Sequence, residues 1–344
     1  MLNPLKYVRP NILALEPYST ARDEFSGGEI SAWLDANENP FNNGLNRYPD
    51  PRHLHLKKLI AELKGVHPNQ VFIGGSGSDE AIDIIFRTFC IPGKDNVVSI
   101  APSYGVYKVS AAINDIEYRP VLLNKDFSMD TQRILDACDS NTKVIWICSP
   151  NNPTGNSFPV NDILYISENF NGIVAVDEAY ADFSSQPSML QYINSHPNLI
   201  VLQTFSKAWG LASLRVGMAF SSADIADIFG KVKYPYNLNG PTQIEIAKRL
   251  ETSVKEQVEH IVSMRRELEQ ELKKCPNVLE VYPSDANFIL VKVKDANRMY
   301  DHLIGGGVII RNRTSQPLCE NCLRITVGTP EENLQTIKLF NSYE

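Results

Sequence analysis

The feature that most constrains the fold of this chain is a regular alternation of short apolar runs with stretches of helical periodicity, which begins near residue 71. Each apolar run has the length of a strand, and helical patterns such as residues 162–169 lie between most of them. Buried strands separated by helices are typical of a mostly parallel sheet with both faces covered, in which ligands bind at the carboxyl ends of the strands. The expected strands are residues 71–73, 97–101, 144–148, 173–176 and 199–202.

The pattern changes after Pro235, and a second lobe is expected there. Residues 241–275 form one long, charged stretch of helical period, and residues 286–293 alternate like a half-buried strand. Further strands are expected at 308–311 and 323–327, and a last helix from Pro330. We therefore predict an α/β protein with three parts: an N-terminal segment packing with the small domain (1–45), a large domain with a mostly parallel central sheet (46–240), and a linking helix with a smaller α+β domain (241–344).

The composition limits the partners that the chain is expected to have. With 33 basic and 40 acidic residues and no basic block, nucleic acid is not expected as a partner. No apolar run approaches the length that spans a bilayer, and residues 1–12 lack the apolar core of a secretory leader. Six cysteines in such a chain indicate free thiols and a reducing, cytoplasmic setting.

Two patterns suggest metal binding at first sight, but neither supports it. Cys319 and Cys322 form a single pair, which cannot complete a tetrahedral zinc site, so we interpret them as part of an ordinary loop. His53 and His55 are spaced by two and do not share one helical face. No metal is expected.

The segment TFSKAWGLASLRVG, residues 204–217, carries the strongest chemical signal. Lys207 directly follows a buried apolar strand, where desolvation favours the neutral amine that attacks a carbonyl and forms a Schiff base. Arg215, eight positions later, could bind a phosphate with its guanidinium fork. A lysine with a nearby phosphate-binding group is what an enzyme that uses pyridoxal phosphate needs. A lysine and an arginine on an ordinary turn remain the alternative.

Other candidate residues follow the neighbouring strands. GGSGSD, residues 74–79, lies between a strand and a helix, where glycines and free N–H groups could bind an anion, although a plain glycine turn is also possible. Asn152, in SPNNPTG, could donate to a phenolic oxygen. Asp177 in VDEAY could hold a proton on a pyridine nitrogen, with Tyr180 near the same ring, and Tyr104 could stack on it. Each motif alone is weak, but together they would surround one ring.

These motifs give the chain a resemblance to a known family. SPNNPTG, VDEAY, TFSKAWGLASLRVG and LRITVGT resemble the aspartate-aminotransferase-like enzymes that use pyridoxal phosphate (fold type I), and the resemblance covers essentially the whole chain. LEPYSTAR (15–22), LDANENP (34–40), NRYPDP (46–51) and VIIRNR resemble a subgroup that acts on a phosphorylated amino alcohol. The other substrate pair would be glutamate and 2-oxoglutarate.

The resemblance implies a role for each matching residue. It implies a homodimer in which Tyr48 of one subunit reaches the cofactor phosphate of the other. Lys207, Asp177 and Tyr180 would be catalytic, with Lys207 forming the Schiff base and Asp177 on the pyridine nitrogen. The implied cofactor-binding set is Gly77, Ser78, Asp79, Tyr104, Asn152, Asp177, Tyr180, Ser206, Lys207, Arg215 and Tyr48; the implied substrate-binding set is Tyr18, Asn37, Tyr236, Arg311 and Arg324.

Rival functions remain at this point. An aromatic-amino-acid aminotransferase or a decarboxylase of a phosphorylated amino acid would keep the cofactor motifs and differ around Tyr18, Tyr236 and Arg311. A ligand-sensing regulator would carry a DNA-binding domain, which we do not expect because the similarity begins near residue 10.

Overall fold

The computed structural model describes residues 3–18 and 31–343, and its larger part is a seven-stranded sheet in the order β1-β7-β6-β5-β4-β2-β3. Strand β7 is antiparallel to its neighbours β1 and β6, whereas the pairs from β6 to β3 are parallel. The strands are β1 (Val71–Gly77), β2 (Asn96–Ala101), β3 (Glu117–Leu122), β4 (Thr142–Cys148), β5 (Ile173–Asp177), β6 (Leu199–Thr204) and β7 (Gly217–Phe220). The five predicted strands of the large sheet are confirmed.

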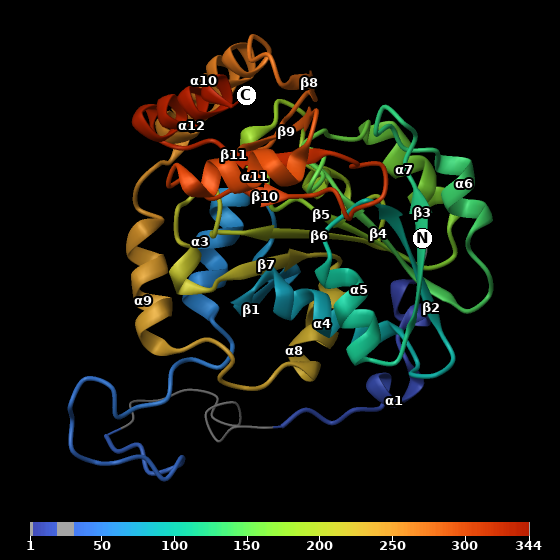
Figure 1. The fold of residues 1–344 in the computed structure, drawn as a ribbon. Helices are drawn as coiled ribbons and strands as arrows, with labels where there is room; N and C mark the ends of the chain where they lie inside the picture. Colours follow the sequence, from blue (N-terminus) through green and yellow to red (C-terminus); the bar gives the residue numbers. More distant parts are fainter. Residues whose placement is uncertain (1–2, 19–30, 344) are drawn as a thin grey trace.

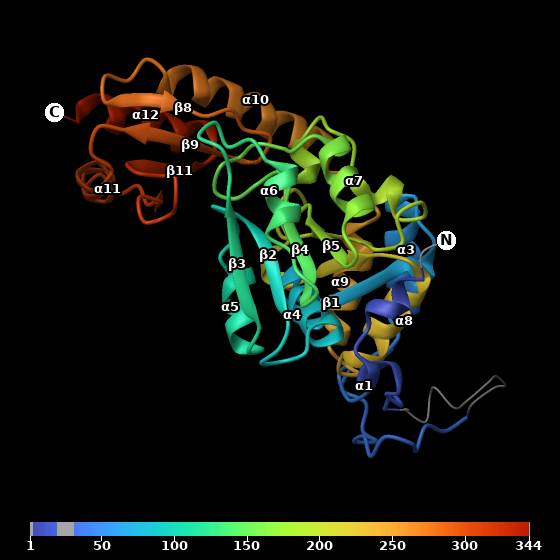
Figure 2. The ribbon, with the colours of Figure 1, turned by 90° about the vertical axis from the view of Figure 1, so that its right-hand side faces the viewer.

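Helices cover both faces of this sheet (Figures 1 and 2). Successive residues of β4 show why both faces are needed, because Ile145 and Ile147 belong to one apolar cluster and Val144 and Trp146 to the other. The first cluster includes residues of α3 (Leu54–Lys64), α6 (Thr131–Asp136) and α7 (Val160–Asn169). The second includes residues of α4 (Ser78–Phe89), α5 (Val106–Ile113) and α8 (Ala223–Val232).

A four-stranded antiparallel sheet, in the order β10-β11-β9-β8, forms the second lobe (Figure 1). It consists of β8 (Val278–Val281), β9 (Phe288–Val293), β10 (Arg311–Asn312) and β11 (Cys322–Thr326), with helices α11 (Ala296–Gly305) and α12 (Pro330–Ser342). The predicted strand at 308–311 is wrong in its bounds. The Val308 N–H donates to Leu303 O at the end of α11, and regular pairing begins only at Arg311.

The single long helix predicted for residues 241–275 is also wrong. The segment forms two helices, α9 (Gly240–Arg249) and α10 (Lys255–Leu272). At the break, Thr252 Oγ1 donates to Arg249 O at 3.0 Å and Ser253 Oγ accepts the Lys255 N–H at 3.2 Å. These side chains compete for backbone groups that a continuous helix would pair internally.

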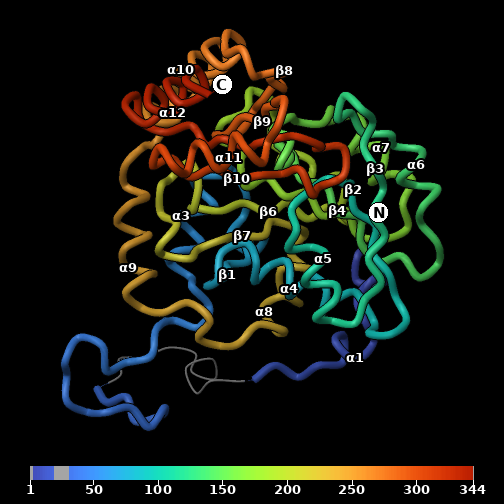
Figure 3. The backbone as a smooth tube through the Cα atoms, in the orientation of Figure 1, coloured from blue at the N-terminus to red at the C-terminus, as the bar shows by residue number. Residues whose placement is uncertain are grey.

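The N-terminal residues pack on the large sheet's helices. Residues 4–7 form a short 3-10 helix, and α1 (Pro10–Leu13) follows. The Arg9 N–H donates to Thr88 O at the end of α4, and Val8 is buried in the cluster that contains α4 and α8. The expectation that this segment packs with the small domain is therefore corrected for residues 3–13. The backbone trace shows the chain after residue 31 extending away from the body and returning to it where Tyr48 stacks on Tyr236 (Figure 3). Within the described ranges, no helix is long and apolar enough to cross a membrane.

Candidate active site

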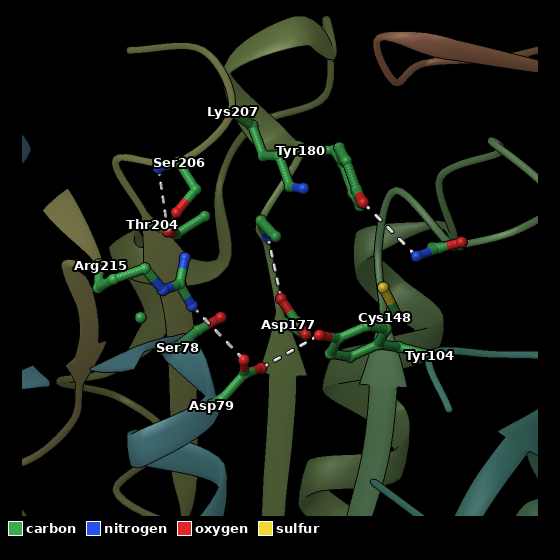
Figure 4. Close-up of a pocket in the computed structure, with 13 residues that line it drawn as sticks. Ser78, Asp79, Tyr104, Cys148, Asp177, Tyr180, Thr204, Ser206, Lys207 and Arg215 are labelled. Atoms are coloured by element: carbon green, nitrogen blue, oxygen red, sulfur yellow. Dashed lines mark hydrogen bonds and ion pairs between the residues drawn. The ribbon is translucent and has the colours of Figure 1, made fainter. Parts of the chain in front are cut away.

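A single cavity brings together ten of the predicted site residues (Figure 4). The ends of four parallel strands build it, since Gly77, Cys148, Asp177 and Thr204 are the last residues of β1, β4, β5 and β6. The predicted residues that line it are Gly77, Ser78, Asp79, Tyr104, Asn152, Asp177, Tyr180, Ser206, Lys207 and Arg215. Cys148, Ala179 and Thr204 line it as well. The cavity lies at the carboxyl ends of these strands, where the sequence predicts that ligands bind.

Lys207 projects into this cavity from the turn after β6. Its Nζ lies 5.6 Å from the centre of the Tyr180 ring. Burial lowers the pKa of Lys207 below its ordinary 10.5, and the positive charge of Arg324 lowers it further, while Asp177 acts in the opposite direction. The environment therefore favours the neutral amine, which is the nucleophilic form.

Asp177 is a carboxyl group at the floor of the cavity and is 2% exposed. Its Oδ2 accepts a hydrogen bond from Tyr107 Oη at 2.6 Å, and its Oδ1 accepts the Ala179 N–H at 3.0 Å. Burial raises the pKa of Asp177, whereas these two donors and the charge of Lys207 oppose the rise. A carboxylate held in this way would pair strongly with a cationic ring nitrogen.

Tyr107 is a functional candidate that sequence reasoning missed. Its ring is fully buried, stacked on Trp146 with centroids 4.8 Å apart and set edge-on to Tyr104 at 5.6 Å. The only sequence signal was its position three residues after Tyr104 in PSYGVY, with Tyr107 in the first turn of α5 and Tyr104 just before the helix begins. Its contact with Asp177 joins residues 70 positions apart.

One corner of the cavity, where β1 leads into α4, has the donors that an anion would need. The helix has no side-chain cap, so the N–H groups of its first turn face the cavity without a side-chain acceptor. Gly77 has φ = +77°, and a Cβ there would lie 2.8 Å from Arg215 Nη2. Arg215 is held by Ser76 O at 3.0 Å and lies 3.7 Å from Asp79 Oδ2. Ser206 completes the corner, its N–H donating to Thr204 Oγ1 at 3.1 Å.

Tyr104 is anchored to the same corner. Its hydroxyl donates to Asp79 Oδ1 at 3.1 Å, and burial followed by the charge of Asp79 raises its pKa. The phenol is therefore held in its neutral form, with its ring lining the cavity. This placement is compatible with the predicted stacking role, which stays a prediction.

The small lobe reaches the cavity through Arg324. Its Nη1 donates to Asn152 Oδ1, and Asn152 Nδ2 in turn donates to Tyr180 Oη at 3.5 Å. The guanidinium also lies over the Phe288 ring, 5.1 Å from its centre. Arg311 stands directly opposite Arg324 in the β10–β11 pairing, so the two predicted substrate arginines are neighbours on one face.

The remaining predicted residues do not line the cavity of the single chain. Tyr18 and Asn37 are exposed, and Asn37 has φ = +52°. Tyr48 stacks on Tyr236 with ring centres 4.4 Å apart. Their roles in substrate or cofactor binding stay predictions. Cys319 lies in the turn before β11 and Cys322 is the first residue of that strand. The described part of the chain has no cluster of three or more potential metal ligands.

Comparison with known proteins gives the class to which this fold and site belong. The sequence profile of aminotransferase class I and II matches residues 21–338. The chain therefore belongs to the class I and II aminotransferases, and the protein is a transaminase.

Individual relatives are more specific. The chain is 52% identical over 342 residues to the histidinol-phosphate aminotransferase of Christiangramia forsetii, covering 98% of this chain and 97% of the relative. It is 50% identical over 338 residues to the enzyme of that name from Bacteroides fragilis, covering 98% of each chain.

Solved structures share the fold. The histidinol-phosphate aminotransferase of Clostridium acetobutylicum has a TM-score of 0.80 at 20% identity, covering 86% of this chain and 90% of the other. The enzyme of that name from Sinorhizobium meliloti, in complex with pyridoxal-5'-phosphate, has a TM-score of 0.79 at 23% identity. The match covers 86% of this chain and 82% of the other. The predicted aspartate-aminotransferase-like architecture is confirmed.

Proposed function

We propose that this protein is a pyridoxal-phosphate-dependent aminotransferase of histidine biosynthesis, which interconverts L-histidinol phosphate and 2-oxoglutarate with imidazole acetol phosphate and L-glutamate. The observation that carries the proposal is the pairing of Arg311 with Arg324 beside a cavity that contains Lys207 and Asp177. The relatives with about half of their residues identical, over nearly the whole chain, carry this name. The six free cysteines suit a reducing cytoplasm.

The donor set of the cavity fits pyridoxal phosphate. Lys207 offers a partly desolvated amine for the aldehyde, and Asp177 offers a buried carboxylate for the pyridine nitrogen. The uncapped start of α4, with Ser78, Ser206 and Arg215, offers donors for the phosphate. Gly77 leaves the space that a Cβ would take from Arg215. Asn152 and Tyr180 would hold the phenolic oxygen.

Bound pyridoxal phosphate supplies an aldehyde and a ring that accepts electrons. Asp177 keeps the ring nitrogen protonated, because a nearby negative charge favours the cation. The Lys207 amine would act as the general base and acid that moves a proton to and from the reacting carbon of the substrate. Tyr107 would orient Asp177 through its hydrogen bond, and the centre of the Tyr180 ring lies 5.6 Å from Lys207 Nζ.

The two arginines explain how one pocket accepts two unlike substrates. A phosphate dianion accepts several charge-assisted hydrogen bonds, which two converging guanidinium groups can supply. The same pair can hold the two carboxylates of glutamate, one on each arginine. Tyr18 would add a hydroxyl donor to the phosphate, and Asn37 and Tyr236 would border the substrate.

The active unit is proposed to be a homodimer. The segment that extends from the body exposes apolar side chains, among them Leu34 at 89% and Phe41 at 80%. Exposed apolar groups of this size on an extended arm favour a protein partner. A two-fold interface would carry Tyr48 of each subunit to the cofactor phosphate of the other. Tyr48→Phe should then weaken cofactor retention without loss of the fold, and a fully active monomer in sedimentation at assay concentration would contradict the shared site.

The deciding experiment compares histidinol phosphate with histidinol. Each amine is mixed with cofactor-loaded enzyme, and the loss of the absorption band of the lysine-bound cofactor is followed. We expect a strong preference for the phosphorylated amine. Arg311→Ala should lower kcat/KM for histidinol phosphate by the equivalent of about 2–5 kcal/mol, because the phosphate loses one of its charged partners. Alanine as donor should be poor and insensitive to this change. Equal use of both amines would overturn the proposal in favour of an aromatic-amino-acid aminotransferase, and release of carbon dioxide from a phosphorylated amino acid would favour a decarboxylase.

A further inference from the structure

A third arginine, Arg313, belongs to the same strand hairpin as Arg311 and Arg324. Its N–H donates to Cys322 O at 2.8 Å, so the β10–β11 pairing continues past Asn312. The side chain is half-buried, and its Nε is buried without a hydrogen-bond partner among the described residues. Arg324 Nε has the same condition. Both guanidinium groups therefore have donor capacity that the described protein leaves unused.

Strand alternation predicts which way these side chains face. Leu323 and Ile325 pack in the core of the small lobe, whereas Arg324 between them reaches Asn152 at the cavity. Asn312 points to Asn297 on α11, with 2.8 Å between Nδ2 and Oδ1. Arg311 and Arg313 flank Asn312, so both lie on the opposite face from it, which is the face of Arg324.

Three guanidinium groups on one face repel one another. Burial lowers the pKa of Arg313 to about 10, and the charges of Arg324 and Arg311 are the next largest causes. None of the three forms an ion pair with a carboxylate of residues 3–18 or 31–343. Like charges that face each other across strands destabilise a sheet. A bound anion would offset the repulsion among the three guanidinium groups. Three positive charges are balanced better by a dianion than by a single carboxylate.

We propose that Arg313 is a specificity-determining residue that recognises the second negative charge of the distal phosphate. This inference rests on the proposed function. The two carboxylates of glutamate need one arginine each, and Arg311 with Arg324 supply them. The third guanidinium is surplus in that half-reaction, whereas a phosphate dianion has three oxygens and can use it. Arg313 therefore favours the phosphorylated amine over the dicarboxylate in a pocket that serves both.

The test uses Arg313→Gln, which keeps polar volume and removes the charge, and Arg313→Lys, which keeps the charge. Half-reaction kcat/KM is measured in the loaded dimer with histidinol phosphate and with glutamate. We expect Arg313→Gln to reduce kcat/KM about tenfold or more for histidinol phosphate, through KM, and less than about twofold for glutamate. Arg313→Lys should recover part of the loss. Inorganic phosphate should inhibit the glutamate half-reaction of Arg313→Gln more weakly than that of the wild type.

Controls separate specificity from general damage. Arg298→Gln makes the same change on an exposed arginine of α11 in the same lobe and should alter neither substrate. Equal losses for both substrates in Arg313→Gln, or an unchanged ratio between them, would overturn the role of Arg313. That result differs from failure of the proposed function, which appears in the wild type as equal use of histidinol phosphate and histidinol.

Discussion

Tyr107→Phe removes one hydroxyl from a fully buried ring and should weaken cofactor binding. The lost hydrogen bond is 2.6 Å long and ends on Asp177, which is itself 2% exposed, so water does not replace it. A hydrogen bond to a charged group contributes about 1.5–3 kcal/mol. At 1.4 kcal/mol per factor of ten, cofactor affinity should fall by about ten- to a hundredfold.

The loss of cofactor affinity, rather than a gain, follows from the electrostatics of Asp177. Tyr107 lowers the pKa of this carboxyl against the effect of burial, and its loss leaves burial less opposed. The pKa of Asp177 rises, the group carries less negative charge, and the protonated ring nitrogen is held less firmly. The absorption band of the bound cofactor should therefore change its pH dependence as well as its affinity.

The assay is a titration of cofactor-free protein with pyridoxal phosphate, followed by absorbance across a range of pH. Tyr118→Phe is the matched control, because Tyr118 packs against the same apolar cluster from β3 but does not line the cavity. Wild-type affinity and an unchanged pH profile in Tyr107→Phe would refute the reasoning. An equal loss in Tyr118→Phe would assign the effect to packing.

Three further predictions concern Lys207, His53 and Gly77. Borohydride reduction of the loaded enzyme should attach the cofactor covalently to Lys207, and attachment to another lysine would contradict the assignment. The rate of cofactor capture should reach half its maximum below pH 10.5, because the pKa of the Lys207 amine is lowered below that value. Burial lowers the pKa of His53 from 6.5 to about 4. Between these pH values His53 is protonated in the unfolded chain but neutral in the folded chain. The free energy of unfolding should therefore fall by up to about 3 kcal/mol as the pH falls from 6.5 to 4. Urea unfolding should show a flatter acid dependence for His53→Asn, whereas the exposed His55→Asn should keep the wild-type slope. Gly77→Ala should displace Arg215 and weaken cofactor retention about tenfold, while Gly65→Ala, also at positive φ but with open space around it, should leave retention unchanged.

Strands that are buried on both faces were predictable because their apolar runs are continuous. All six residues of β6 are buried, and the corresponding run at 199–202 was recognised within two residues of its end. Strand β3 was missed because it lies at the sheet edge, with Glu117 and Pro120 exposed, and so lacks an apolar run. The break at Thr252 and Ser253 was missed because their side-chain hydrogen bonds interrupt a pattern that remains charged and periodic on both sides.

The cofactor end of the site was more predictable than the substrate end. Residues that end consecutive strands, such as Asp177, must lie near residues such as Lys207 that follow the next strand in the sheet, so their order along the chain carries spatial information. Tyr107 reaches the site through packing of α5 against Trp146. Arg313 joins Arg324 through the register of one hairpin, which residue types alone do not specify.

The division of the site between two sheets affects how enzymes of this kind diverge. The groups that line the cavity come from the larger lobe, whereas the arginines proposed to bind the substrate anion belong to the β10–β11 hairpin. Exchanging this hairpin between relatives could alter the accepted substrate while leaving the lysine and its surroundings intact. Arg324 is the exception, because its hydrogen bond to Asn152 joins the two sheets. Substitutions at positions 311 and 313 should therefore act on substrate choice alone, whereas substitutions at position 324 should also disturb Asn152 in the cavity.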